Sequence, residues 1–204
     1  MIAQAIRAEF YGEPGQQATI SFLDNDDQPG EIPLTFAPRP GEKTEITPDL
    51  PPAHVEFSAY RLTPEIGYLG FSGFLQGVDE DAFTAIDEMM DTGTLIIDLR
   101  GNPGGVFPVR KAIAEKLAGE RVLFWRYQQR DRLETVYLEA MPTAYEGGLV
   151  ILIDELSASS SEEFAGGLQA IGRATIVGGH SPGRTPTAII MPLENGAILV
   201  YPYG

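Results

Sequence analysis

Residues 149–179 are LVILIDELSASSSEEFAGGLQAIGRATIVGG, and this stretch decides the fold. It opens with a continuous apolar run, which is typical of a β-strand buried on both faces. After a serine-rich turn, residues 160–171 place Phe164, Leu168 and Ile171 at helical spacing. A second short apolar run follows at residues 174–177. The stretch therefore predicts strand, loop, helix and strand, which is the unit of a parallel sheet.

The same alternation extends in both directions from this stretch. We expect strands at residues 66–74, 94–99, 121–128 and 134–139, and helices at residues 79–91 and 109–117. At the end of the chain, residues 188–193 and 197–202 predict a hairpin across Glu194-Asn195-Gly196, a type I′ turn signal. The pattern predicts an α/β fold with a mainly parallel sheet.

The residues before about position 60 have a different pattern. A short helical turn is expected at residues 2–10, and strands at residues 18–23 and 31–36 are expected to pair across the polar turn NDDQPG. Residues 39–52 are rich in proline and polar side chains, which is typical of a linker. This part contains too few apolar residues to form a core by itself.

The composition excludes several classes of function. The net charge is −15, from 29 acids and 14 bases, which disfavours binding to nucleic acids or anionic membrane surfaces. The chain has no cysteine and only two histidines, so thiolate sites and a zinc site of several imidazoles are not expected. No apolar run approaches the ~20 residues that span a bilayer, and the first residues lack the apolar core of a signal peptide. We expect no metal or cofactor.

Two loops follow buried strands, and both could contribute to a site. The first is Arg100–Gly105 (RGNPGG), whose paired glycines would allow backbone N–H groups to point into one concavity. Such donors are what an oxyanion hole requires. Spacing alone favours a glycine-rich entry into a helix, with no ligand.

The second loop is Leu156–Glu163 (LSASSSEE), at a turn from strand to helix. A serine there lies near the positive end of the helix dipole, where an oxyanion is stabilised. The alternative is helix capping, because Ser159 with Glu162, and Ser160 with Glu163, both have the spacing of a capping box.

The order of these motifs, TLIIDLRGNPGG, then the 149–179 stretch, then a glycine-basic pair, resembles the C-terminal processing (tail-specific) serine peptidases. Within them it is most similar to the branch of the tricorn core protease and the interphotoreceptor retinoid-binding protein modules. The resemblance covers residues 60–204. It implies a crotonase-like core of stacked ββα units, with Ser159 as the nucleophile. It also implies an oxyanion hole made by the N–H of Ser160 and that of Gly104 or Gly105.

The resemblance also has implications for the whole chain. Residues 1–59 look like the last strands of a PDZ domain plus a linker, and residues 60–204 look like a catalytic core that is truncated at its C-terminal end. We therefore expect a fragment of a longer protein that hydrolyses peptides or proteins. Members of this family are usually extracytoplasmic, which is the expected compartment. The oligomeric state stays open.

The general base is where this chain departs from the pattern. The lysine of one branch corresponds to Arg184, 25 residues after Ser159, and a guanidinium is not a general base at neutral pH. Arg184 could instead orient a substrate carboxylate, or be a surface cation. His180 is a weak candidate base, Glu162 is expected to cap or orient, and His54 is expected to be a solvated loop residue. We expect this chain alone to be inactive or nearly so.

Two other functions fit the same core. One is a non-catalytic ligand-binding module, similar to the retinoid-binding relatives, because no base can be assigned. The other is an acyl-CoA enzyme of the crotonase type, which the Ser-Ala-Ser-x-x-Glu run disfavours.

Overall fold

The first compact unit contains an antiparallel hairpin. A computed structural model describes residues 12–44, 52–185, 188–193, 195 and 197–202, and divides the chain into units 1–40 and 41–204. In the first unit, β1 (Gln17–Leu23) pairs with β2 (Pro29–Thr35), with Ile20 opposite Ile32. The predicted hairpin is confirmed, whereas the helix predicted at residues 2–10 lies outside the described residues.

The second unit is built on a five-stranded sheet of order β11-β10-β7-β6-β5. Strands β6, β7, β10 and β11 are parallel and β5 is antiparallel to β6, which confirms the predicted α/β class and mainly parallel sheet. The strands are β5 (Phe57–Thr63), β6 (Ile66–Phe71), β7 (Thr94–Asp98), β10 (Gly148–Ile153) and β11 (Thr175–Gly178).

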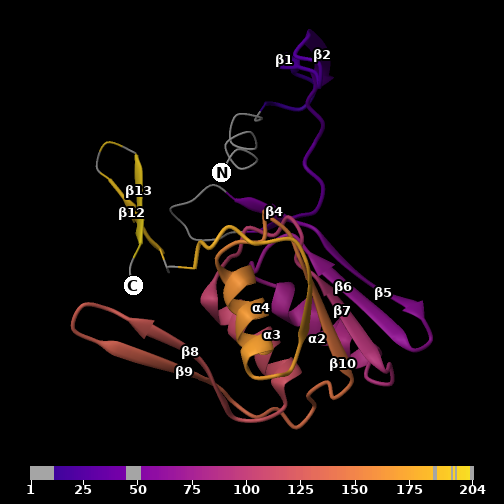
Figure 1. Ribbon diagram of the computed structural model, residues 1–204, viewed down its shortest axis with the longest axis vertical. Coiled ribbons are helices and arrows are strands. Elements are labelled where there is room, and N and C mark those ends of the chain that lie inside the picture. The colour runs from indigo at the N-terminus through magenta and orange to yellow at the C-terminus, as the bar shows by residue number, and fades with distance from the viewer. Residues whose placement is uncertain (1–11, 45–51, 186–187, 194, 196, 203–204) are drawn as a thin grey trace. The chain divides into compact units, whose positions relative to one another are not determined.

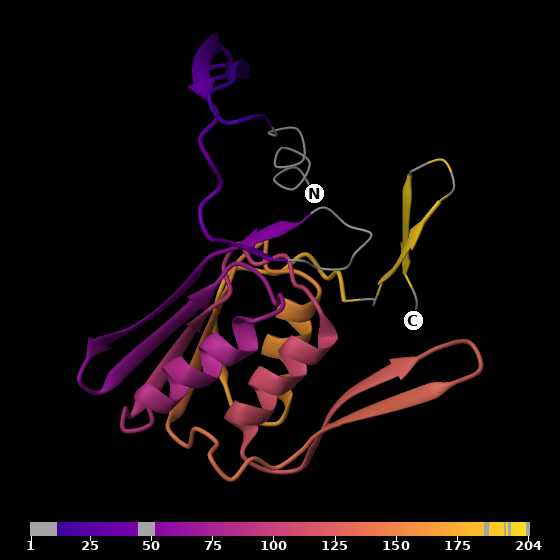
Figure 2. The ribbon, with the colours of Figure 1, turned by 180° about the vertical axis from the view of Figure 1, so that it is seen from behind.

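Three helices lie side by side against one face of this sheet (Figures 1 and 2). They are α2 (Val78–Glu88), α3 (Phe107–Ala118) and α4 (Ser160–Ala170). Alternate residues of the central strands, such as Leu95, Ile97 and Ile151, are fully buried beneath them. Phe164 and Leu168 of α4 are fully buried too, so the helical spacing that predicted α4 is the face that packs on the sheet.

Among the described residues, this unit also has three two-stranded antiparallel sheets. They are β3 (Glu42–Thr44) with β4 (Ala53–Val55), β8 (Val122–Gln128) with β9 (Leu133–Leu138), and β12 (Ala188–Pro192) with β13 (Ile198–Pro202). The last confirms the predicted C-terminal hairpin, although Glu194 and Gly196 of its predicted turn lie outside the described residues.

Two local expectations differ from the structure. Strand β5, over Phe57–Thr63, was not predicted. His54 was expected in a solvated loop, but it lies half-buried in β4, opposite Lys43 of β3. Strand β4 is short and strand β5 is mostly exposed, so their pairing with neighbouring strands, rather than an apolar sequence pattern, defines them.

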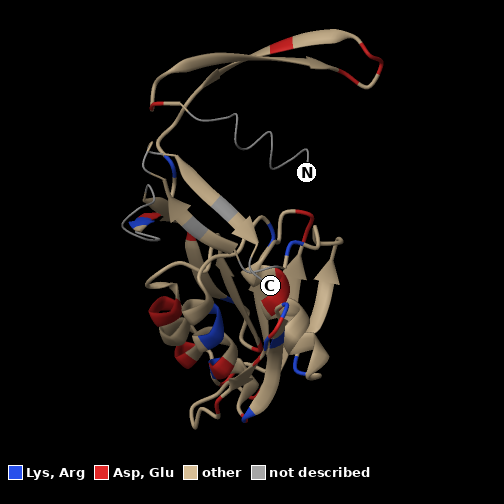
Figure 3. Cartoon of the chain, turned by 90° about the vertical axis from the view of Figure 1, so that its left-hand side faces the viewer, with Lys and Arg blue, Asp and Glu red and all other residues tan. Residues whose placement is uncertain are grey.

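The acidic charge and the helix lengths can be described for the residues that the structure covers. Acidic residues are spread over helices, strands and loops in the part of the chain that is described, rather than gathered on one element (Figure 3). No helix in that part is both long and apolar enough to cross a membrane.

Candidate active site

The two predicted site loops lie next to each other. Strands β7 and β10 are parallel neighbours, so the loops at their carboxyl ends leave the same edge of the sheet. Asn102 connects them: its carbonyl accepts hydrogen bonds from the N–H of Ala158 (3.1 Å) and from Ser161 Oγ (2.9 Å). Asn102 is fully buried, and its side-chain amide also donates to the carbonyl of Phe71 at 2.9 Å.

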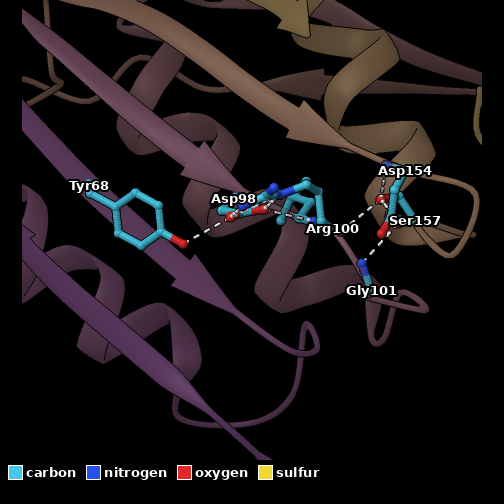
Figure 4. A network of polar contacts seen from close by, with 7 residues as sticks. Tyr68, Asp98, Arg100, Gly101, Asp154 and Ser157 are labelled. Carbon is cyan, nitrogen blue, oxygen red and sulfur yellow. Dashed lines mark hydrogen bonds and ion pairs between the residues drawn. The ribbon is translucent and has the colours of Figure 1, made fainter. Parts of the chain in front are cut away.

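Asp154, directly after β10, forms hydrogen bonds to both loops. One of its carboxylate oxygens accepts the N–H of Gly101 (2.9 Å) and that of Leu156 (3.0 Å). Burial raises the pKa of Asp154, but the hydrogen bonds from Gly101, Leu156 and Ser157 outweigh it, so the pKa lies below its usual range. Ser157 Oγ lies between the loops, donating to the carbonyl of Leu99 at 2.7 Å and accepting the Asp154 N–H at 2.9 Å (Figure 4).

A second polar cluster lies at the end of β7 (Figure 4). The Asp98 carboxylate accepts hydrogen bonds from Tyr68 Oη (2.9 Å) and from Arg100 Nη2 (2.6 Å) and Nε. Burial raises the pKa of Asp98, but these bonds, chiefly from Arg100, lower it below the usual value. Burial and the bond to Asp98 raise the pKa of Tyr68 to about 12. The cluster anchors the first residue of the glycine-rich loop.

The four serines of the second loop have different environments. Ser157, Ser160 and Ser161 are at most 3% exposed, and each hydroxyl donates to a backbone carbonyl: those of Leu99, Gly105 and Asn102 respectively. Ser159 is partly exposed, and its hydroxyl donates to no residue that the structure describes. Only the Ser159 hydroxyl is therefore both accessible and free to give up its proton.

Ser159 also has an uncommon backbone. Its φ is 53° and its ψ is −118°, a conformation that costs a non-glycine residue of order 1–3 kcal/mol and that clusters at functional sites. Ser159 is the N-cap of α4, and its N–H donates to Glu162 Oε2 at 2.9 Å in the predicted Ser159–Glu162 capping box. The alternative Ser160–Glu163 box is wrong, because Ser160 Oγ donates to Gly105 and Glu163 pairs with Arg110.

The glycine-rich loop approaches the serine turn closely. A Cβ on Gly104, whose φ is +107°, would lie 2.8 Å from Ser159 Cβ and 2.9 Å from the Ser160 nitrogen. The Gly104 N–H donates to Asn102 Oδ1 at 2.9 Å. By contrast, the N–H groups of Gly105 and Ser160 have no hydrogen-bond partner among the described residues. Of the two predicted glycine donors, Gly105 is the one whose N–H is available.

The side chains of the predicted base candidates Glu162 and His180 make no hydrogen bond to the Ser159 hydroxyl among the described residues. The Glu162 carboxylate accepts three backbone N–H groups, from Ser159, Gly183 (2.6 Å) and Arg184 (2.8 Å). Glu162 therefore orients the loop that contains Arg184, next to the serine turn. The side chain of His180 is exposed, and no hydrogen bond joins it to Ser159. Within the described residues, no group of three or more His, Asp or Glu side chains could hold a metal.

Sequence reasoning missed the residues that hold the loops. Asn102 and Asp154 were seen only as members of a turn and a strand, and Arg110 only as part of a helix. An Asp at the end of a buried strand, followed by Ser three residues later, was the available signal for the Asp154–Ser157 contact.

Comparison with known proteins gives the family. Residues 65–204 match the model of peptidase family S41. The carboxyl-terminal-processing peptidase 3, chloroplastic, of Arabidopsis thaliana is 32% identical over 136 residues, covering 65% of this chain and 26% of the relative. The carboxy-terminal-processing protease of Bartonella bacilliformis is 31% identical over 147 residues, covering 68% of this chain and 34% of the relative.

A solved structure shows the same fold. The photosystem II D1 C-terminal processing protease superposes with a TM-score of 0.69 at 21% identity, covering 99% of this chain and 53% of that chain. Compared with the two peptidase relatives from Arabidopsis and Bartonella, the chain spans only about a third or less of their length. The family match over residues 65–204 includes both site loops, and the chain belongs to peptidase family S41, the C-terminal processing peptidases.

Proposed function

We propose that this chain carries the nucleophile and the oxyanion hole of a serine endopeptidase, with Ser159 as the nucleophile. One observation carries the proposal. Among four neighbouring serines, Ser159 alone has an accessible hydroxyl with no acceptor among the described residues, and it adopts a strained backbone conformation at the start of a helix.

The chemistry follows from the geometry around Ser159. Its Oγ attacks the carbonyl carbon of a peptide bond, and the carbonyl oxygen becomes an oxyanion. The N–H groups of Ser160 and Gly105, both without a partner among the described residues, supply two donors to this oxygen, and the N-terminus of α4 adds its dipole. The C–N bond then breaks, the amine leaves with a proton, and water hydrolyses the acyl-enzyme.

The base that takes the Ser159 proton lies outside the described residues in this proposal. The carboxylate of Glu162 already accepts three N–H groups, and no hydrogen bond joins the exposed His180 to Ser159. A guanidinium such as that of Arg184 is not a general base at neutral pH. A hydroxyl without a base is a poor nucleophile, so we expect the 204-residue chain alone to be inactive or nearly so.

The remaining assignments follow from the resemblance and from the relatives. We propose a peptide or protein substrate and an extracytoplasmic location. The hairpin β1–β2 is proposed to be the end of a PDZ-like segment, and residues 60–204 to form a crotonase-like core of the tricorn type.

Covalent labelling tests the proposal. A fluorophosphonate probe applied to the natural protein that contains this chain should modify one serine, which peptide mapping should identify as Ser159. Ser159→Ala should abolish the labelling, and heat-denatured protein serves as a further control. Absence of labelling in the folded natural protein would contradict a peptidase and favour a binding module on the same fold.

A further inference from the structure

A buried ion pair connects the two helices that follow the site loops. Arg110 of α3 and Glu163 of α4 are 2% and 3% exposed, and Arg110 Nη1 pairs with Glu163 Oε2. Arg110 Nη2 also donates to Tyr127 Oη at 3.0 Å, and the guanidinium lies 5.0 Å from the centre of the Phe107 ring. Arg110 Nε is buried without a partner among the described residues, so Glu163 is the only carboxylate that compensates this cation there.

Each partner is one helical turn from a predicted oxyanion donor. The N–H of Arg110 donates to the carbonyl of Val106 at 3.3 Å, and Val106 directly follows Gly105. The N–H of Glu163 donates to the carbonyl of Ser159 at 3.0 Å, and Ser159 directly precedes Ser160. The ion pair therefore links the first turn of α3 to the first turn of α4, close to where their backbones supply N–H groups to the site.

Stability alone does not account for this pair. Burial lowers the pKa of Arg110, which reflects the cost of removing the charge from water. A buried ion pair is often matched or exceeded in stability by apolar residues of the same volume, and its best-attested use is to fix the register of the elements that it joins. Here the elements are α3 and α4, so the ion pair would fix the register of two helices whose first turns border the site.

We propose that Arg110 and Glu163 are positioning residues, which set the distance between the N–H groups of Gly105 and Ser160. The proposal rests on the proposed function of Ser159. Without the pair, apolar packing would still hold α3 against α4, but with freedom to slide. Displacements of about 1 Å in an active site reduce rates by about a hundredfold, so smaller shifts should have effects of about tenfold.

The test separates probe binding from the labelling step. In the natural protein, the double variant Arg110→Met/Glu163→Leu removes both charges and keeps apolar bulk. We expect a melting temperature close to that of the wild type, a fluorophosphonate KI changed by less than about twofold, and a maximal labelling rate reduced by about tenfold or more. A role in stability alone would change the melting temperature and leave the labelling rate intact.

The matched control is an ion pair at the other end of the same helix. Lys116 of α3, 2% exposed, pairs with Asp87 of α2, and α2 carries neither site loop. Lys116→Met/Asp87→Leu should leave the labelling rate unchanged. If this control slows labelling as much as the Arg110/Glu163 variant does, or if the latter labels at the wild-type rate, the proposal is wrong.

Glu163→Asp provides a second test should the double variant fail to fold. It keeps the charge but shortens the side chain by one methylene, so it alters reach rather than electrostatics. We expect slower labelling with an unchanged KI, and a wild-type labelling rate would overturn the proposal. Failure of the proposed function is distinguishable, because the wild-type protein would then not be labelled at all.

Discussion

At the scale of single residues, neighbouring serines in one loop have opposite roles. Ser157 is fully buried and joins β7 to β10 through Leu99 and Asp154, whereas the Ser159 hydroxyl is accessible. Ser157→Ala removes the acceptor of the Asp154 N–H and one of the two hydrogen bonds to the Leu99 carbonyl, which still accepts the Asn102 N–H. We expect a loss of about 1–3 kcal/mol in the free energy of unfolding, measured by urea titration.

Labelling should separate the two positions. At a temperature where Ser157→Ala is folded, the fluorophosphonate should still modify Ser159, whereas Ser159→Ala should remove the labelling. Labelling that is lost in Ser157→Ala while the protein remains folded would contradict a purely structural role for Ser157.

Gly104 is the other residue on which the loops depend. Its φ is +107°, and a Cβ there would lie 2.8 Å from the carbonyl oxygen of Ala158 and from Ser159 Cβ, both of which are held in place. Gly77, at the N-cap of α2, has a similar φ of +93°, but a Cβ added there would have nothing within 4 Å. Comparing alanine variants at Gly77 and Gly104 therefore separates the cost of backbone strain from the cost of steric conflict.

We expect Gly77→Ala to lose about 1–2 kcal/mol of unfolding free energy, the cost of a left-handed conformation for alanine. Gly104→Ala should lose more and should also abolish the labelling of Ser159. Thermal unfolding and probe labelling measure the two effects, and equal stability losses with intact labelling in both variants would contradict the close approach of the loops.

At the scale of elements, Glu162 ties the loop at residues 181–184 to the start of α4. Its carboxylate accepts the N–H groups of Gly183 and Arg184 in addition to that of Ser159. Glu162→Ala removes the acceptor for all three. We expect faster hydrogen exchange at the Gly183 and Arg184 amides, measured by mass spectrometry of peptides from this loop.

The control for this prediction is Glu155→Ala, since Glu155 is an exposed carboxylate in the loop just before Ser157. Exchange at residues 181–184 should not change in that variant. Equal exchange in the wild type and in Glu162→Ala would mean that the loop is held by other contacts.

The elements were predicted well where local pattern decides them. The apolar runs of β7 and β10 and the helical spacing of α4 are properties of neighbouring residues, and the structure has all three. The Ser160–Glu163 capping box was wrong because the partner that Glu163 takes, Arg110, is 53 positions earlier in the chain. Local spacing cannot reveal a competitor that only the packing of α3 on α4 brings near.

At the scale of the whole molecule, the sheet order determines which sequence signals meet. Both loops were recognised from sequence, but their contact depends on β7 and β10 being adjacent, and on Asn102 and Asp154 spanning the gap. Strand β5 completes the sheet by pairing with β6. Its residues are mostly exposed and mix polar with apolar side chains, so the sequence did not indicate a strand there. The sequence pattern thus predicted the two loops but not the strand order that brings them together.

The sheet also links stability to pH through Tyr68 of β6, which donates to Asp98 of β7. Burial, together with this bond, raises the pKa of Tyr68 from 10.0 to about 12. The folded state therefore holds the phenol proton more tightly than the unfolded state does. This stabilisation is fully present below pH 10 and is lost as the pH rises toward 12.

We therefore expect the wild-type protein to lose stability more steeply between pH 10 and pH 12 than Tyr68→Phe does, as measured by the urea midpoint at each pH. Tyr137→Phe is the control, because the Tyr137 ring faces Arg121, at 4.2 Å, rather than a carboxylate, and its alkaline profile should follow that of the wild type. The absorbance of phenolate at high pH provides an independent reading, in which one tyrosine should titrate late in the wild type and be missing in Tyr68→Phe. Parallel stability profiles for the wild type and Tyr68→Phe would show that the Tyr68–Asp98 bond does not couple β6 to β7 in solution.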